Sequence, residues 1–214
     1  MKSRYTDTDA AEFIARYAHT PGCNEDIALR VYTSRLLGSD GALVLHGGGN
    51  TSVKTLLRDD TGALVDVLCV KGSGWDLDTL EPRGLPALRM DSLVRLRERD
   101  ALSDEDMVNA QRTRLLDASA PNPSVETLLH AFLPATFIDH SHADAVLALA
   151  NQPNSAELCR EVFGDTLAIV PYVMPGFALA KLAAQVAAAH PSAHGLVLLN
   201  HGLFTYGATA QESY

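Results

Sequence analysis

Cysteine, proline and glycine are all scarce in this 214-residue sequence, at 3, 10 and 15 residues respectively. Cys23, Cys69 and Cys159 are odd in number and far apart, and they match neither a disulfide framework nor a Cys-x-x-Cys metal or redox motif. Proline and glycine are too few for a low-complexity linker or a collagen-like repeat. Any metal site in this chain must therefore use histidines and carboxylates.

Positive charge is also scarce, because 17 Lys and Arg face 26 Asp and Glu and give a formal net charge of −9. Nucleic-acid binding needs a basic face, so we expect no nucleic-acid partner. A phosphate-bearing metabolite would need local positive potential from amide N–H groups, a metal ion or a few lysines.

Long apolar runs are absent from the sequence as well. No stretch approaches the ~18 apolar residues that span a bilayer, and the N-terminus lacks the apolar segment of a secretion signal. We expect no membrane contact and a cytoplasmic location.

The 47% of apolar residues is enough for the core of one domain, and their periodicity predicts its elements. Helices are expected at 7–18, 24–37, 91–99, 103–116, from Ser124 to Pro134, and at 177–190. Strands are expected at 42–45, 52–57, 63–70, 135–142, 167–170 and in a hairpin over 195–207. This order predicts an α/β domain around a mixed, largely antiparallel sheet.

Two histidines at the end of a predicted strand are candidate metal ligands. The two-residue period of a strand sends the side chains of His140 and His142 to the same face. His201 follows another apolar strand and precedes Gly202, so it is a candidate third ligand. By spacing alone a chance pair among eight histidines remains an alternative, and His19, His46, His130, His190 and His194 have no evident partner.

Glu126 lies in the first turn of the helix that Ser124 is expected to cap. A carboxylate there complements the helix dipole. Near a metal, the same group would instead serve as a general base. The sequence leaves both roles open.

Two glycine loops follow predicted strands, at Gly47-Gly48-Gly49 and at Gly72-Ser73-Gly74. The first loop leads into β-like residues rather than the helix that the Rossmann fingerprint needs, and it lacks the Walker spacing. It therefore fits neither of these nucleotide-binding motifs. In the second, free N–H groups, the Ser73 hydroxyl and the Lys71 charge would form an anion nest. Ordinary turns remain the alternative for both loops.

Five segments occur in the order typical of one family: GGGNTSVK, VKGSGWDL, PSVETLLHAFLP, DHSHADAV and LLNHGLFTYG. Together they span almost the whole chain, and the sequence resembles the class II aldolase/adducin family. It is most similar to the N-terminal aldolase part of bifunctional rhamnulose-1-phosphate aldolase/short-chain alcohol dehydrogenases. The resemblance implies a three-layer αβα domain, assembled as a homo-oligomer, with a tetramer favoured.

The resemblance also implies residue roles. His140, His142 and His201 match the zinc ligands, and Glu126 matches the catalytic acid/base. Five further residues match the positions that bind the substrate phosphate in the family, namely Asn50, Ser52, Gly72, Ser73 and Ser124.

This chain departs from the family pattern at two places. Val125 stands where the aldolases commonly have a second serine before the glutamate. The tyrosine that a neighbouring subunit contributes has only Tyr172 as a weak candidate.

The implied activity is zinc-dependent, or otherwise divalent-metal-dependent, cleavage of a sugar phosphate. A rhamnulose 1-phosphate-like ketose 1-phosphate would give dihydroxyacetone phosphate and lactaldehyde through a metal-stabilised enediolate. A sugar-phosphate epimerase, a dehydratase or a catalytically inactive adducin-like scaffold are the alternatives. The domain is expected to cover residues 1–214, and the short segment from Thr209 to Tyr214 predicts a truncated domain whose parent continues into a short-chain dehydrogenase.

Overall fold

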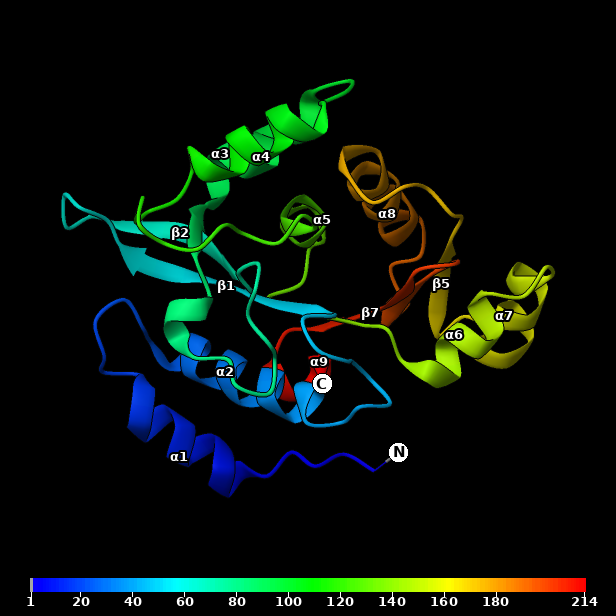
Figure 1. Cartoon of the computed structure of the whole chain (residues 1–214), viewed down its shortest axis with the longest axis horizontal. Coiled ribbons are helices and arrows are strands. Elements are labelled where there is room, and N and C mark those ends of the chain that lie inside the picture. Colours follow the sequence, from blue (N-terminus) through cyan, green and yellow to red (C-terminus); the bar gives the residue numbers. More distant parts are fainter. Residues whose placement is uncertain (1) are drawn as a thin grey trace.

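A seven-stranded sheet runs through the computed structural model, which describes residues 2–214 (Figure 1). The strand order across the sheet is β3-β2-β1-β4-β7-β6-β5. All neighbours pair antiparallel except β5 and β6, which are parallel, so the predicted mixed, largely antiparallel sheet is confirmed. The strands are β1 (Asn50–Arg58), β2 (Leu64–Val70), β3 (Ala87–Arg89), β4 (Phe137–Ser141), β5 (Leu167–Val170), β6 (Gly195–Leu198) and β7 (Gly202–Gly207).

Helices cover both faces of this sheet. In Figure 1, α1, α2 and α9 lie below the sheet, and α3, α4, α5 and α8 lie above it, which confirms the three-layer αβα domain. Within residues 2–214 no helix is long and apolar enough to cross a membrane. The helices are α1 (Asp7–Tyr17), α2 (Glu25–Gly38), α3 (Met90–Val94), α4 (Asp104–Arg112), α5 (Thr127–Phe132), α6 (Asp144–Ala150), α7 (Ser155–Phe163), α8 (Phe177–Ala189) and α9 (Ala210–Ser213), with short 3₁₀ turns at Pro82–Gly84 and Arg95–Glu98.

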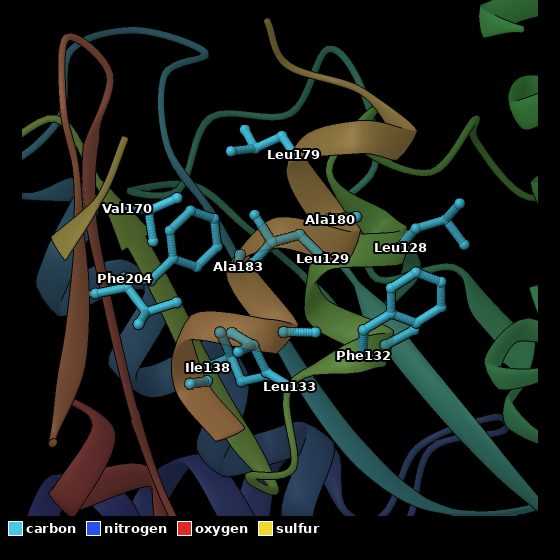
Figure 2. Close-up of a cluster of buried hydrophobic side chains, with 14 of the residues drawn as sticks. Leu128, Leu129, Phe132, Leu133, Ile138, Val170, Leu179, Ala180, Ala183 and Phe204 are labelled. Atoms are coloured by element: carbon cyan, nitrogen blue, oxygen red, sulfur yellow. The ribbon is translucent and has the colours of Figure 1, made fainter. Parts of the chain in front are cut away.

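The alternating side chains of β4 separate the two main cores. Ile138 faces α5 and α8, where it packs with Phe204 and Leu129 (Figure 2). Phe137 points to the other face and packs with Val53 in the cluster between the sheet and α2. Full burial of one such side chain contributes about 1.5–3 kcal/mol, so these clusters fix which face of β4 turns toward which layer.

Helix starts follow the polar caps in the sequence. The side chains of Asn24, Ser103 and Thr209 accept the N–H of the third residue along, which caps α2, α4 and α9. Helix α5 differs, because it begins at Thr127 rather than after Ser124. The Ser124 hydroxyl accepts the Glu126 N–H at 3.2 Å in a preceding turn, so Ser124 ends the loop instead of capping the helix.

The expected strand at 42–45 is wrong. Residues 41–43 form a turn, and Leu45 is exposed. The Leu43 carbonyl accepts the His142 N–H at 3.0 Å, and the Ala42 carbonyl accepts the Asp144 N–H at 2.9 Å. This apolar run therefore holds the segment after β4 by two backbone hydrogen bonds.

A buried ion pair ties the layer below the sheet to β4. Arg30 on α2 contacts the Asp139 carboxylate at 2.5 Å, and both side chains are buried. Ser213 on α9 donates its hydroxyl to the same carboxylate. The ion pair lies on the face of β4 opposite His140.

Candidate functional site

Three histidines meet at one end of the β4–β7 pair. His140 is the fourth residue of β4, His142 follows its end, and His201 lies in the turn between β6 and β7. One ring nitrogen from each lies within 4.8 Å of the others, and the Nε2 atoms of His140 and His142 are 3.0 Å apart. The fold thus brings together the three residues that the sequence predicted as one ligand set.

The surroundings of His140 and His142 favour the neutral form of both rings. The Leu203 carbonyl lies 3.1 Å from His140 Nδ1 and only accepts, so Nδ1 carries the proton and Nε2 offers its lone pair. Burial lowers the pKa of His140 to about 4, against the opposing charge of Glu126. Burial, followed by the charge of His201, also lowers the pKa of His142. Neutral imidazoles with free lone pairs are the form that binds metal.

Two neighbouring residues shape the histidine group. The Phe204 ring stacks on the His140 ring with centroids 4.2 Å apart, so it fixes the plane of that imidazole. A Cβ on Gly202 would lie 2.5 Å from the Ser141 carbonyl oxygen and 2.9 Å from the His140 ring. Glycine is therefore required for this close approach of β7 to β4.

Glu126 reaches the histidines from the start of α5. Its side chain is buried, with Oε1 3.2 Å from His201 Nε2 and Oε2 3.4 Å from His140 Nε2. Asn50 donates its amide to Oε2 at 2.6 Å. Burial alone would raise the pKa of Glu126, but His140, His201 and the Asn50 amide outweigh it and hold the pKa below its ordinary range. The carboxylate is ionised and placed beside the ligand set.

His130, which sequence reasoning left without a partner, belongs to this site. It is fully buried on α5, and its ring contacts the Ser52 hydroxyl through Nδ1 at 2.8 Å and the Asn50 carbonyl oxygen through Nε2. Burial lowers the pKa of His130 to about 3, so the ring is neutral. The sequence did contain one signal that could have placed His130 at the site. It lies four residues after Glu126, and residues with this spacing share a helix face.

A pocket of about 310 Å³ opens in front of Glu126 and the histidines. Four of the five predicted phosphate positions line it, namely Asn50, Gly72, Ser73 and Ser124. Ser52 does not, because its side chain is buried against His130. The departure Val125 is 59% exposed at the pocket wall.

The anion nest expected from free amides of the second glycine loop is not formed. The Gly72 N–H donates to the Gly84 carbonyl and the Ser73 N–H to the Asn122 carbonyl, both at 2.8 Å. Of the described residues that line the pocket, Lys71 is the only Lys or Arg. Its side chain is buried and donates to the Gly47 carbonyl at 3.2 Å. Burial lowers the pKa of Lys71, and the charges of Asp76 and Glu126 only partly oppose this shift.

The donor set fits a divalent metal ion. Three imidazoles converge, His201 Nδ1 is buried without a hydrogen-bond partner in the described chain, and the pocket leaves room beside them. Three protein ligands with an open position are typical of catalytic zinc. Tyr172 lies in an exposed loop, 51% accessible.

Comparison with known proteins gives a consistent picture. Residues 28–214 match the model of the class II aldolase and adducin N-terminal domain. The chain is 41% identical over 184 residues to YuxG of Bacillus subtilis (strain 168), an uncharacterized oxidoreductase. That match covers 86% of this chain and spans only 27% of the relative's length.

Among solved structures, the N-terminal class II aldolase domain of a conserved protein from Thermoplasma acidophilum is 41% identical. It superposes with a TM-score of 0.87 over 100% of this chain and 92% of that one. A sugar-phosphate aldolase from Thermotoga maritima shares the fold at 15% identity, with a TM-score of 0.64 over 89% of this chain and 88% of that one.

Proposed function

The chain belongs to the class II aldolase and adducin family, and on this premise we propose that it is a metal-dependent aldolase domain acting on a ketose 1-phosphate. A rhamnulose 1-phosphate-like substrate would be cleaved reversibly to dihydroxyacetone phosphate and lactaldehyde. One observation carries the proposal: the ionised, buried Glu126 lies within 3.4 Å of two rings of a three-histidine group. An adducin-like binding scaffold gains nothing from burying a carboxylate there, because burying a charge costs free energy.

The residues divide the work of cleavage. His140, His142 and His201 would hold Zn²⁺ or another divalent ion. When bound, the ion supplies Lewis acidity that stabilises the negative charge left by breaking a carbon–carbon bond next to a ketone.

Cleavage is balanced in protons. The hydroxyl that becomes the aldehyde loses one proton, and the carbon left behind gains one. Glu126 is ionised and faces the pocket beside the histidines, so it is placed to carry that proton. A general acid/base in this position contributes roughly 10²–10⁴-fold to the rate.

Phosphate binding falls to a smaller set of groups than the resemblance implied. The Ser73 and Ser124 side chains line the pocket, and the Lys71 ammonium supplies the positive charge. The amide N–H groups of Gly72 and Ser73 are already used by backbone carbonyls. Binding the remote phosphate would orient the reacting bond at the metal.

The experiment is a substrate panel. Protein loaded with Zn²⁺ or Co²⁺ is incubated with ketose 1-phosphates, and dihydroxyacetone phosphate and lactaldehyde are measured. We expect both products in equal amounts from at least one substrate. Formation of an epimer or a dehydrated sugar instead would assign the same metal site to an epimerase or a dehydratase, and no turnover by the metal-loaded protein would overturn the proposal.

We further propose a homo-oligomer, with a tetramer favoured. Val125 at the pocket wall and Met174, next to the pocket residue Pro175, are 59% and 70% exposed, and burial of such side chains favours association. Light scattering on the purified protein tests this, and a monomer at micromolar concentration would refute it.

A further inference from the structure

A buried row of polar side chains runs behind the Glu126 carboxylate. It consists of Ser52 on β1, His130 on α5, Asn50 at the start of β1, and Glu126 itself. Each of these side chains is at most 8% exposed. We propose that His130 is a positioning residue that holds the Glu126 carboxylate in place through the Asn50 amide.

The chemistry of each group sets the direction of every hydrogen bond. An ionised carboxylate only accepts, so Asn50 turns its Nδ2 toward Glu126 Oε2, at 2.6 Å. The Asn50 carbonyl oxygen then faces His130 Nε2, which must carry the proton. A neutral imidazole has one N–H, so His130 Nδ1 accepts the Ser52 hydroxyl proton at 2.8 Å.

This direction gives His130 a definite role. If the Asn50 amide turned over, its oxygen would face the carboxylate and its NH₂ would face the His130 N–H. Both contacts would be repulsive. The proton on His130 Nε2 therefore stabilises the one amide orientation that donates to Glu126.

The neutral state that this arrangement requires agrees with the surroundings. His130 is fully buried, and its ring lies edge-on to Phe204 with centroids 5.4 Å apart. Ser52 is 0% exposed and is not one of the residues that line the pocket. Ser52 and His130 thus act on Glu126 from within the core, through the pocket-lining Asn50.

Two variants of similar shape separate this role from packing. In His130→Gln, the side-chain amide can replace the ring Nε2–H toward Asn50. In His130→Asn, the shorter amide can replace only Nδ1 toward Ser52. The inference rests on the proposed aldolase function for its kinetic readout, so both variants are compared with the parent at saturating metal.

We expect His130→Asn to lower kcat roughly 10- to 100-fold, with KM and bound metal close to the parent, because supporting groups behind a reactive residue have effects of this size. His130→Gln should retain most of the activity. If the parent cleaves substrate and the two variants have equal kcat, the positioning role is overturned.

Two further measurements do not depend on activity. Nitrogen-15 NMR of the parent should show His130 protonated on Nε2 and not on Nδ1. Crystal structures should show the Glu126 carboxylate displaced from Asn50 in His130→Asn and retained in His130→Gln.

A proton on Nδ1, or an unmoved carboxylate in His130→Asn, would overturn the inference. If the parent cleaved no ketose 1-phosphate, the proposed function would fail, and these two measurements would still decide the role of His130.

Discussion

Replacing Gly202 by alanine should weaken metal binding at the three histidines. The new Cβ would lie 2.5 Å from the Ser141 carbonyl oxygen, 2.9 Å from His140 Cε1 and 3.0 Å from His142 Cδ2, whereas ordinary contacts begin at 3.4 Å. The backbone of β4 or β7 must therefore shift by several tenths of an ångström. Metal–ligand distances tolerate only about ±0.2 Å.

We expect the metal affinity of Gly202→Ala to fall by roughly 10- to 100-fold, the scale for disturbed supporting groups of a metal site. Overpacking should also cost about 1–3 kcal/mol of unfolding free energy. Competition against a chromophoric chelator measures the first effect, and urea unfolding measures the second.

Gly41→Ala is the matched control, because its Cβ would meet only Leu45 Cδ2 at an ordinary 3.5 Å. This variant should bind metal like the parent. Parent-like affinity in Gly202→Ala would refute the reasoning, since it would mean that the metal does not depend on the positions of these rings.

Four other substitutions test the remaining roles. Glu126→Gln should preserve metal content but lower cleavage by roughly 10²-fold or more, as measured by single-turnover product formation, and an unchanged rate would return Glu126 to a helix-dipole role. Lys71→Met and Ser73→Ala should each raise KM for phosphorylated substrates more than for unphosphorylated ones, and equal effects on both would remove these residues from phosphate binding. Arg30→Met should lower the unfolding free energy by about 3–5 kcal/mol in urea titrations, because it leaves the Asp139 carboxylate buried without its partner; a loss below about 1 kcal/mol would contradict this.

Local signals in the sequence indicated which three histidines would converge and where most elements would lie. His140 and His142 are two residues apart at a strand end, and His201 is next to a glycine, so their convergence needed only the pairing of β4 with β7. The helices expected to start at residues 24 and 103 begin directly after these residues, because the side chains of Asn24 and Ser103 cap them by local hydrogen bonds.

The errors arose where distant partners decide the outcome. The run at 42–45 has the composition of a strand but pairs with the segment after β4 by only two carbonyls. The free amides expected at Gly72 and Ser73 are used by Gly84 and Asn122, far along the chain. Ser52 and His130 find each other only when β1 packs against α5. No sequence period reports such contacts.

The alternation of side chains along β4 has a consequence for how the protein avoids misfolding. His140 points toward Phe204 and Asp139 points toward Arg30, on opposite faces of one strand. If β4 paired one residue out of register, the faces would exchange, and a carboxylate would enter the apolar layer while an imidazole met the buried guanidinium. Each of these two contacts leaves a buried charge without its partner, so the out-of-register pairing would be unstable even without a metal. The side chains of β4 therefore couple the two layers, because the three histidines converge only when the central sheet has paired in the correct register.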